Sequence, residues 1–76
     1  MIWLFERGQE ALRIETRYDK DAGQYVATIY WPDGRSESER FPSEASFRAR
    51  LGALERQLDA EHWQQIGGPK LLNGSD

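Results

Sequence analysis

The residue types that come nearest to a metal site lie in the loop from Asp19 to Gly23. Its order, Asp-Lys-Asp-Ala-Gly, begins like a calcium loop, because hard cations take carboxylate oxygens from alternate positions. An EF-hand continues with a third oxygen ligand, a glycine and a distant glutamate, and two helices flank it. Here strand-like patterns flank the loop. The sequence therefore predicts a hairpin turn at this loop and no metal site.

The single histidine, His62, is the side chain best suited to acid and base chemistry near neutral pH. A catalytic base needs a nucleophile or an orienting acid within hydrogen-bond range. Glu61 adjoins His62, but consecutive residues of a helix point in different directions. We therefore expect a structural or solvated histidine in the last turn of a helix, where an imidazolium interacts favourably with the carbonyl ends.

Hydroxyl and glycine patterns typical of enzymes are missing. No Gly-x-Ser-x-Gly turn surrounds a serine, and Gly67-Gly68 follows a predicted helix, whereas a phosphate-binding loop precedes one. The chain has no cysteine, so it forms neither a disulfide nor a thiolate site. We expect a protein that is not an enzyme and that holds no metal and no cofactor. The serines considered are Ser36, Ser38, Ser43 and Ser46.

Alternating apolar and polar residues predict a run of four strands. Gly8 stands first in a two-residue loop, as a type II′ hairpin turn prefers, and this turn sets Phe5 opposite Leu12 and Trp3 opposite Ile14. Gly23 and the Pro32-Asp33-Gly34 segment supply the next two turns. The predicted strands are Ile2 to Arg7, Leu12 to Arg17, Tyr25 to Trp31 and Arg35 to Phe41.

One helix follows the strands. Ser43 is a good N-cap for a segment from Glu44 to about Trp63 that contains no proline. Its core stripe is formed by residues at helical spacing, namely Phe47, Leu51, Leu54 and Leu58. The predicted fold class is α+β, a four-stranded antiparallel meander (β-β-β-β-α) with the helix packed on one sheet face. We expect one domain over residues 1–66 and a flexible polar tail over residues 67–76.

The inner sheet face holds more bulky apolar side chains than one helix covers. Four strands make a sheet roughly 19 Å wide, whereas a helix is about 10 Å across. A partner is therefore expected to shelter the remainder. The side chains on this face are Trp3, Phe5, Leu12, Ile14, Tyr18, Tyr25, Ala27, Ile29 and Trp31, with Glu37 and Glu39 pointing inward from the edge strand.

The back of the predicted helix is unusually smooth, and two interpretations stay open. Alanine is a good surface helix former, so the back is either a solvated face or the contact face of a homodimer. Gly52 costs about 1 kcal/mol inside a helix, which favours the close approach of a second backbone. The residues of this predicted dimer face are Ala45, Ala49, Gly52, Arg56, Ala60 and Trp63.

The outer sheet face carries three arginines and Tyr30, so it could bind phosphates while the ring stacks on a base. The candidate residues are Arg13, Arg17, Tyr30 and Arg40. The order of four antiparallel strands and a helix resembles the PC4/Whirly single-stranded-DNA-binding fold, and the resemblance is one of topology over Ile2 to Trp63. It implies a dimer that pairs through its helices and binds single-stranded nucleic acid.

The charge and hydropathy of the chain argue against nucleic-acid binding and against a membrane-spanning segment. The net charge of −3 is spread evenly, whereas a nucleic-acid-binding domain normally carries a basic excess. The longest apolar run, Ile2 to Phe5, is too short to cross a membrane, and no signal-peptide pattern follows it. We expect a cytoplasmic interaction module that forms a homodimer and binds protein. Single-stranded nucleic-acid binding is the alternative.

Overall fold

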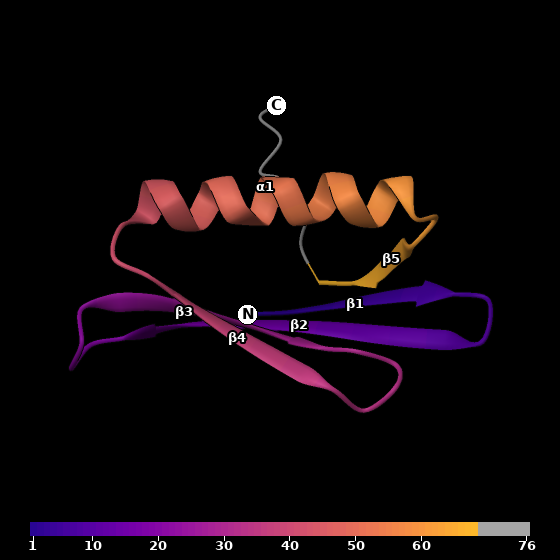
Figure 1. Ribbon diagram of the computed structural model, residues 1–76, viewed down its shortest axis with the longest axis horizontal. Coiled ribbons are helices and arrows are strands. Elements are labelled where there is room, and N and C mark those ends of the chain that lie inside the picture. The colour runs from indigo at the N-terminus through magenta and orange to yellow at the C-terminus, as the bar shows by residue number, and fades with distance from the viewer. Residues whose placement is uncertain (69–76) are drawn as a thin grey trace.

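The computed structural model describes residues 1–68 as one antiparallel sheet with a helix on one face (Figure 1). The strand order in the sheet is β4-β3-β2-β1-β5. The predicted meander of four strands followed by one helix is confirmed, and β5 is a strand that the sequence reading did not contain. The predicted tail falls largely on residues 69–76, which lie outside the described residues. The elements are β1 (Ile2–Arg7), β2 (Glu10–Asp19), β3 (Gln24–Tyr30), β4 (Ser36–Phe41), α1 (Glu44–Ala60) and β5 (Gln64–Gly67).

The first hairpin has the predicted register. Gly8 has a φ of 60°, as the first position of a type II′ turn requires, and the loop sets Phe5 opposite Leu12 and Trp3 opposite Ile14. The side chains of these four apolar residues therefore lie on one face of the sheet, because side chains alternate along a strand. This face is the inner face, toward α1.

The second hairpin is closed by Asp19, which confirms a turn at the loop that resembles a calcium site. Its Oδ1 accepts hydrogen bonds from the backbone N–H groups of Asp21, at 3.1 Å, and Ala22, at 3.2 Å. Gly23 takes a φ of 66°. Because the carboxylate is occupied by its own loop, Asp19 shapes the turn. Within residues 1–68, no group of three acidic, histidine or cysteine side chains could hold a metal ion.

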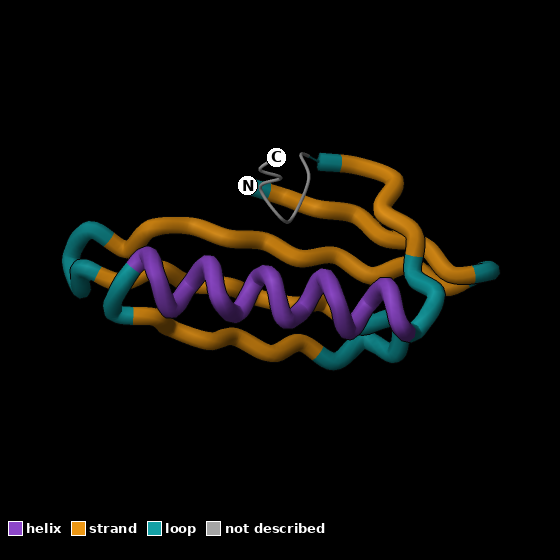
Figure 2. The backbone as a smooth tube through the Cα atoms, turned by 90° about the horizontal axis from the view of Figure 1, so that it is seen from above, coloured by secondary structure: helices purple, strands orange, loops and turns teal. Residues whose placement is uncertain are grey.

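The core lies between the inner sheet face and α1. Figure 2 shows the helix lying lengthwise toward one side of the sheet, with β1 and β5 at the other side. Leu51, Leu54 and Leu58 are buried as predicted, and Phe47 is partly buried against the same cluster. The sheet contributes Trp3, Phe5, Leu12, Ile14 and Ile29. No helix in the described part of the chain is long and apolar enough to span a membrane.

The helix ends at Ala60, earlier than the predicted end at Trp63. The backbone N–H of Trp63 donates to the carbonyl of Leu58 at 2.9 Å, and that of His62 donates to Asp59 at 3.0 Å. These two bonds define a Schellman motif, in which the residue after the C-cap takes a left-handed conformation. Here that residue is His62, with a φ of 69°. The motif turns Trp63 back onto the core beside Leu58.

The prediction that one helix leaves part of the inner face uncovered is confirmed at Tyr18 and wrong for Trp3 and Phe5. Trp3, Phe5 and Trp63 are each 6% exposed or less. Trp63 extends the cover at one end of α1, and at the other end Phe47 stacks on Tyr25 with ring centroids 4.9 Å apart. Tyr18 remains 52% exposed. Trp3 and Phe5 are therefore buried within one chain, Tyr25 and Trp31 are partly buried, and Tyr18 stays exposed.

Candidate functional site

The outer face of the sheet brings the four predicted nucleic-acid contacts into two groups. Arg13 and Tyr30 are directly opposite on β2 and β3, and the guanidinium carbon of Arg13 lies 4.4 Å from the Tyr30 ring centroid. Arg17 and Arg40 lie on either side of Val26 in another row of the same face. The sheet thus places all four on one surface, as predicted.

Two of the three arginines on this face are neutralised by acidic neighbours. Arg13 Nε lies 3.0 Å from Glu15 Oε2, and Arg40 Nη1 donates to Asp19 Oδ2 at 3.0 Å. The Arg40 hydrogen bond is the largest cause lowering the pKa of Asp19, followed by the backbone N–H of Ala22. Arg13 also covers the Tyr30 ring. The face therefore presents little net positive charge and no free aromatic ring.

Exposed apolar side chains gather along β1 and β5. Ile2 and Leu4, which are 52% and 42% exposed, alternate with the buried Trp3 and Phe5 and form what we call the outer apolar strip. Met1, before β1, and Ile66, on β5, are also exposed. Leu4 is paired with Gly67, and a bulge at this point makes Ile66 the extra residue of β5. The exposed Ile66 was absent from the sequence prediction, because that prediction contained no fifth strand.

A depression of about 340 Å³ adjoins the outer apolar strip on the same face. Ile2 and Tyr30 line it, and Val26 and Thr28 lie between them. Val26 is buried although its strand position points away from the helix. The outer face is therefore partly apolar and hollowed beside Ile2, a shape that can receive side chains from another molecule.

The predicted dimer face on the back of the helix is smaller in the structure. Ala45, Ala49, Arg56 and Ala60 are exposed. Gly52 is buried, and Trp63 lies beyond the helix end with its ring in the core. The prediction that Trp63 lies on the back of the helix is wrong, because the Schellman motif breaks the helical periodicity before Trp63. What remains is alanine and one arginine, which offer a small contact area.

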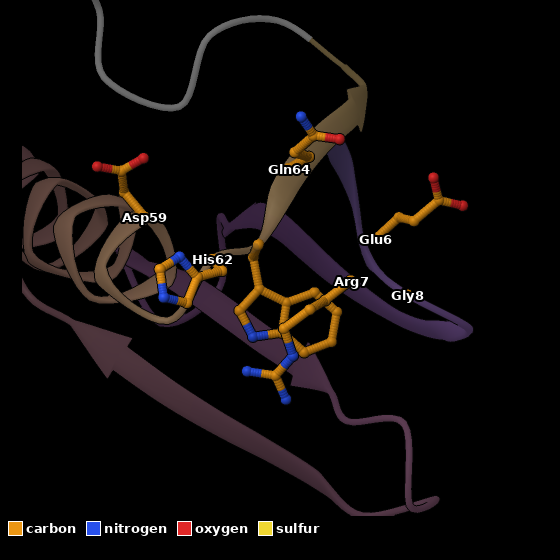
Figure 3. A pocket seen from close by; sticks show the side chains of 7 residues that line it. Glu6, Arg7, Gly8, Asp59, His62 and Gln64 are labelled. Carbon is orange, nitrogen blue, oxygen red and sulfur yellow. The ribbon is translucent and has the colours of Figure 1, made fainter.

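A polar cleft of about 360 Å³ lies at the C-terminal end of α1 (Figure 3). Arg7 holds its guanidinium carbon 4.4 Å from the Trp63 ring centroid and donates to the Glu61 carbonyl at 3.0 Å. Figure 3 shows Glu6 and Asp59 on opposite sides of the cleft. Within the described residues, no side-chain hydrogen bond orients His62. Arg7 therefore closes the core, and the cleft holds no acid and base pair aimed at one point.

The fold and these surfaces define a two-layer α+β domain with one solvent-facing sheet surface. No family model, no curated protein and no solved structure matches the chain in comparisons with known proteins.

Proposed function

We propose that this chain is a non-enzymatic interaction module that works as a homodimer and contacts its partner through the outer sheet face. The observation that supports this proposal is the outer apolar strip. Contiguous exposed apolar side chains are uncommon on monomers and mark interaction surfaces. The strip lies on regular strands, which present it as a rigid surface.

The inner face offers less apolar surface than predicted, because Trp3, Phe5 and Trp63 are buried within one chain and Tyr18 is its exposed ring. The helix back offers mainly the small side chains of Ala45, Ala49 and Ala60. Apolar burial contributes roughly 25 cal/mol per Å², so larger exposed side chains supply more of the association energy. The outer face is therefore the favoured contact surface for the homodimer.

Sedimentation equilibrium tests the proposal. Concentrations of about 10 to 500 μM span dissociation constants of the micromolar class. We expect the mean molar mass to rise from 8.8 kDa toward twice that value. Leu4→Thr removes an exposed apolar side chain while keeping a residue that favours strands, and it is expected to weaken association. Tyr18→Thr is the matched control, because Tyr18 is also exposed but lies outside the strip.

A chain that stays at 8.8 kDa throughout this range contradicts the proposed homodimer. Equal weakening by Leu4→Thr and by Tyr18→Thr contradicts the assignment of the contact to the outer apolar strip. Both variants keep the buried core intact, and circular dichroism checks that they fold. The two results therefore separate self-association from the choice of surface.

Single-stranded nucleic-acid binding is the second proposal, and Arg17 is the observation in its favour. Among residues 1–68 its side chain has no acidic partner, unlike Arg13 and Arg40. Fluorescence titration with labelled oligonucleotides tests this function. Binding through phosphates must weaken between about 50 and 200 mM salt, because counterions are released. Binding that ignores salt contradicts this proposal.

A further inference from the structure

Two charged side chains at opposite ends of the outer face have no partner in the described chain. Arg17 lies near one end of β2, and Glu6 lies near the end of β1. Neither side chain forms an ion pair or a hydrogen bond with any of residues 1–68. Glu6 stands opposite Ala11, so six residues of β2, roughly 20 Å, separate the two charges along the sheet. They cannot pair within one subunit.

Two rows of cross-strand pairs lie between Arg17 and Glu6, and they are self-complementary in charge and size. Ile2 is opposite Glu15 in one row, and Leu4 is opposite Arg13 in the next outward-facing row. Each row thus holds one aliphatic side chain on β1 and one charged side chain on β2. The charges of the two rows are opposite, and the aliphatic side chains are similar in size.

We propose that a second copy of this chain docks face to face on the outer face. The two-fold axis lies in the plane of the interface, at right angles to the strands and between these two rows. This inference rests on the proposed homodimer and specifies its symmetry. Rotation about such an axis places each row over the other row of the second copy. Leu4 then faces Ile2 of the second copy, and Arg13 faces Glu15 of the second copy.

The same rotation brings the unpartnered charges together. Arg17 faces the row that contains Ala11 and Glu6 in the second copy. Glu6 is one strand away from the directly opposed position, about 4.8 Å, which is within the reach of these long side chains. The axis creates two identical Arg17 to Glu6 contacts, one at each end of the interface. Both unpartnered charges are satisfied by one symmetry operation.

The size of the face predicts a weak dimer. Five strands span about 19 Å between the outer strand axes, and the paired rows extend roughly 20 Å, which gives about 400 Å² in projection. A standard interface buries about 800 Å² per partner. The dimer therefore belongs to the small class of interfaces, and the paired charges at its ends set the orientation of the two copies.

Charge reversal in two separate variants tests the axis. Arg17→Glu places two carboxylates at each end of the dimer, and Glu6→Arg places two guanidinium groups there. We expect each variant alone to dimerise about tenfold more weakly than the unmodified chain, because two contacts become repulsive. Lys20→Glu is the control, because it reverses an exposed charge in the β2 to β3 loop.

Mixing the two variants gives the decisive measurement. In a mixed dimer, Glu at position 17 of one chain faces Arg at position 6 of the other, and the remaining pair is the unmodified one. Both ends are then attractive. We expect sedimentation of the equimolar mixture to show association close to that of the unmodified chain, because only a contact between copies can be restored in this way.

Each outcome has one meaning. Loss of association in both variants and recovery on mixing support the two-fold axis. If the unmodified chain dimerises but the variants associate normally, or if mixing restores nothing, the axis is wrong and the homodimer stands. If the unmodified chain is monomeric up to about 500 μM, the homodimer itself is contradicted and the axis falls with it.

Discussion

Replacing His62 with glycine is expected to stabilise the protein. His62 occupies the left-handed position of the Schellman motif with a φ of 69°. At this position glycine is the usual residue, because a Cβ atom crowds the following carbonyl oxygen. His62 is exposed, and its side chain forms no hydrogen bond within residues 1–68. Removing the imidazole therefore costs no packing, while the backbone strain is relieved.

The expected gain follows from two opposing terms. A left-handed residue other than glycine costs about 1 to 2 kcal/mol, whereas glycine adds about 0.5 to 1 kcal/mol of unfolded-state entropy. The difference is a gain of about 0.5 to 1 kcal/mol in the free energy of unfolding for His62→Gly. In a domain of this size, such a gain raises the melting temperature by roughly 2 to 8 °C.

Urea unfolding followed by circular dichroism measures this gain. His62→Ala is the matched control, because alanine removes the imidazole but keeps the Cβ atom that causes the strain. We expect His62→Ala to be no more stable than the unmodified chain. An equal rise for glycine and alanine would show that the imidazole is the destabilising group. No rise for glycine would refute the account of a strained helix end.

Three further predictions concern the elements that position the outer face. Gly68→Ala is expected to lower the free energy of unfolding by at least about 1 kcal/mol, because φ is 89° and a Cβ would lie 2.5 Å from the Ile2 carbonyl oxygen. Gly67→Ala is its control, since its Cβ would meet the side chain of Leu4, with the nearest approach of 3.3 Å at the flexible Cδ1, and no backbone atom. Equal losses in thermal melting would contradict the reasoning. Ser43→Ala is expected to cost about 1 kcal/mol in urea unfolding, because the Ser43 hydroxyl accepts from the Ser46 N–H at the helix N-cap, and an unchanged midpoint would show that this cap is unimportant. The pKa of Asp19 is lowered in the folded state, so its carboxylate stabilises the fold above the unfolded pKa near 3.8. This stability is lost as the pH falls through the folded pKa. Asp19→Asn is therefore expected to make the free energy of unfolding less dependent on pH in the acid range.

The strands and their registers were predictable because local signals agree with the tertiary fold. Gly8 specifies a tight turn, and the alternation after it decides which side chains point inward. A slip of one residue would turn every inner side chain toward solvent, so the pattern excludes other registers. The same alternation holds across the second hairpin, where Tyr18 is opposite Tyr25.

The end of the helix was not predictable from local signals. Gly67 and Gly68 indicate a stop, but the chain leaves the helix after Ala60, where no glycine marks the left-handed position. Trp63 was therefore assigned to the wrong surface. The following strand, Gln64–Gly67, has one large apolar residue, and its pairing depends on the neighbouring edge of β1.

The candidate contacts on the outer face were placed correctly, but their partners were found only in part. The cross-strand register implies that Arg13 and Tyr30 are neighbours, so their contact follows from the hairpin. The pairing of Arg40 with Asp19 joins residues on nonadjacent strands, and it depends on the sheet twist at the end of the hairpin. Sequence patterns therefore located the arginine side chains on this face without showing which of them form ion pairs.

The turn at His62 decides where a partner can bind. Had the helix continued through Trp63, the indole would have faced outward and the core beside Phe5 would have needed cover from another molecule. The Schellman motif instead returns Trp63 to the core, where Arg7 covers its ring. With Trp63 in the core and Tyr18 as the exposed ring of the inner face, Ile2 and Leu4 make the outer face the favoured contact surface. The location of the proposed interface thus follows from the geometry of one helix terminus.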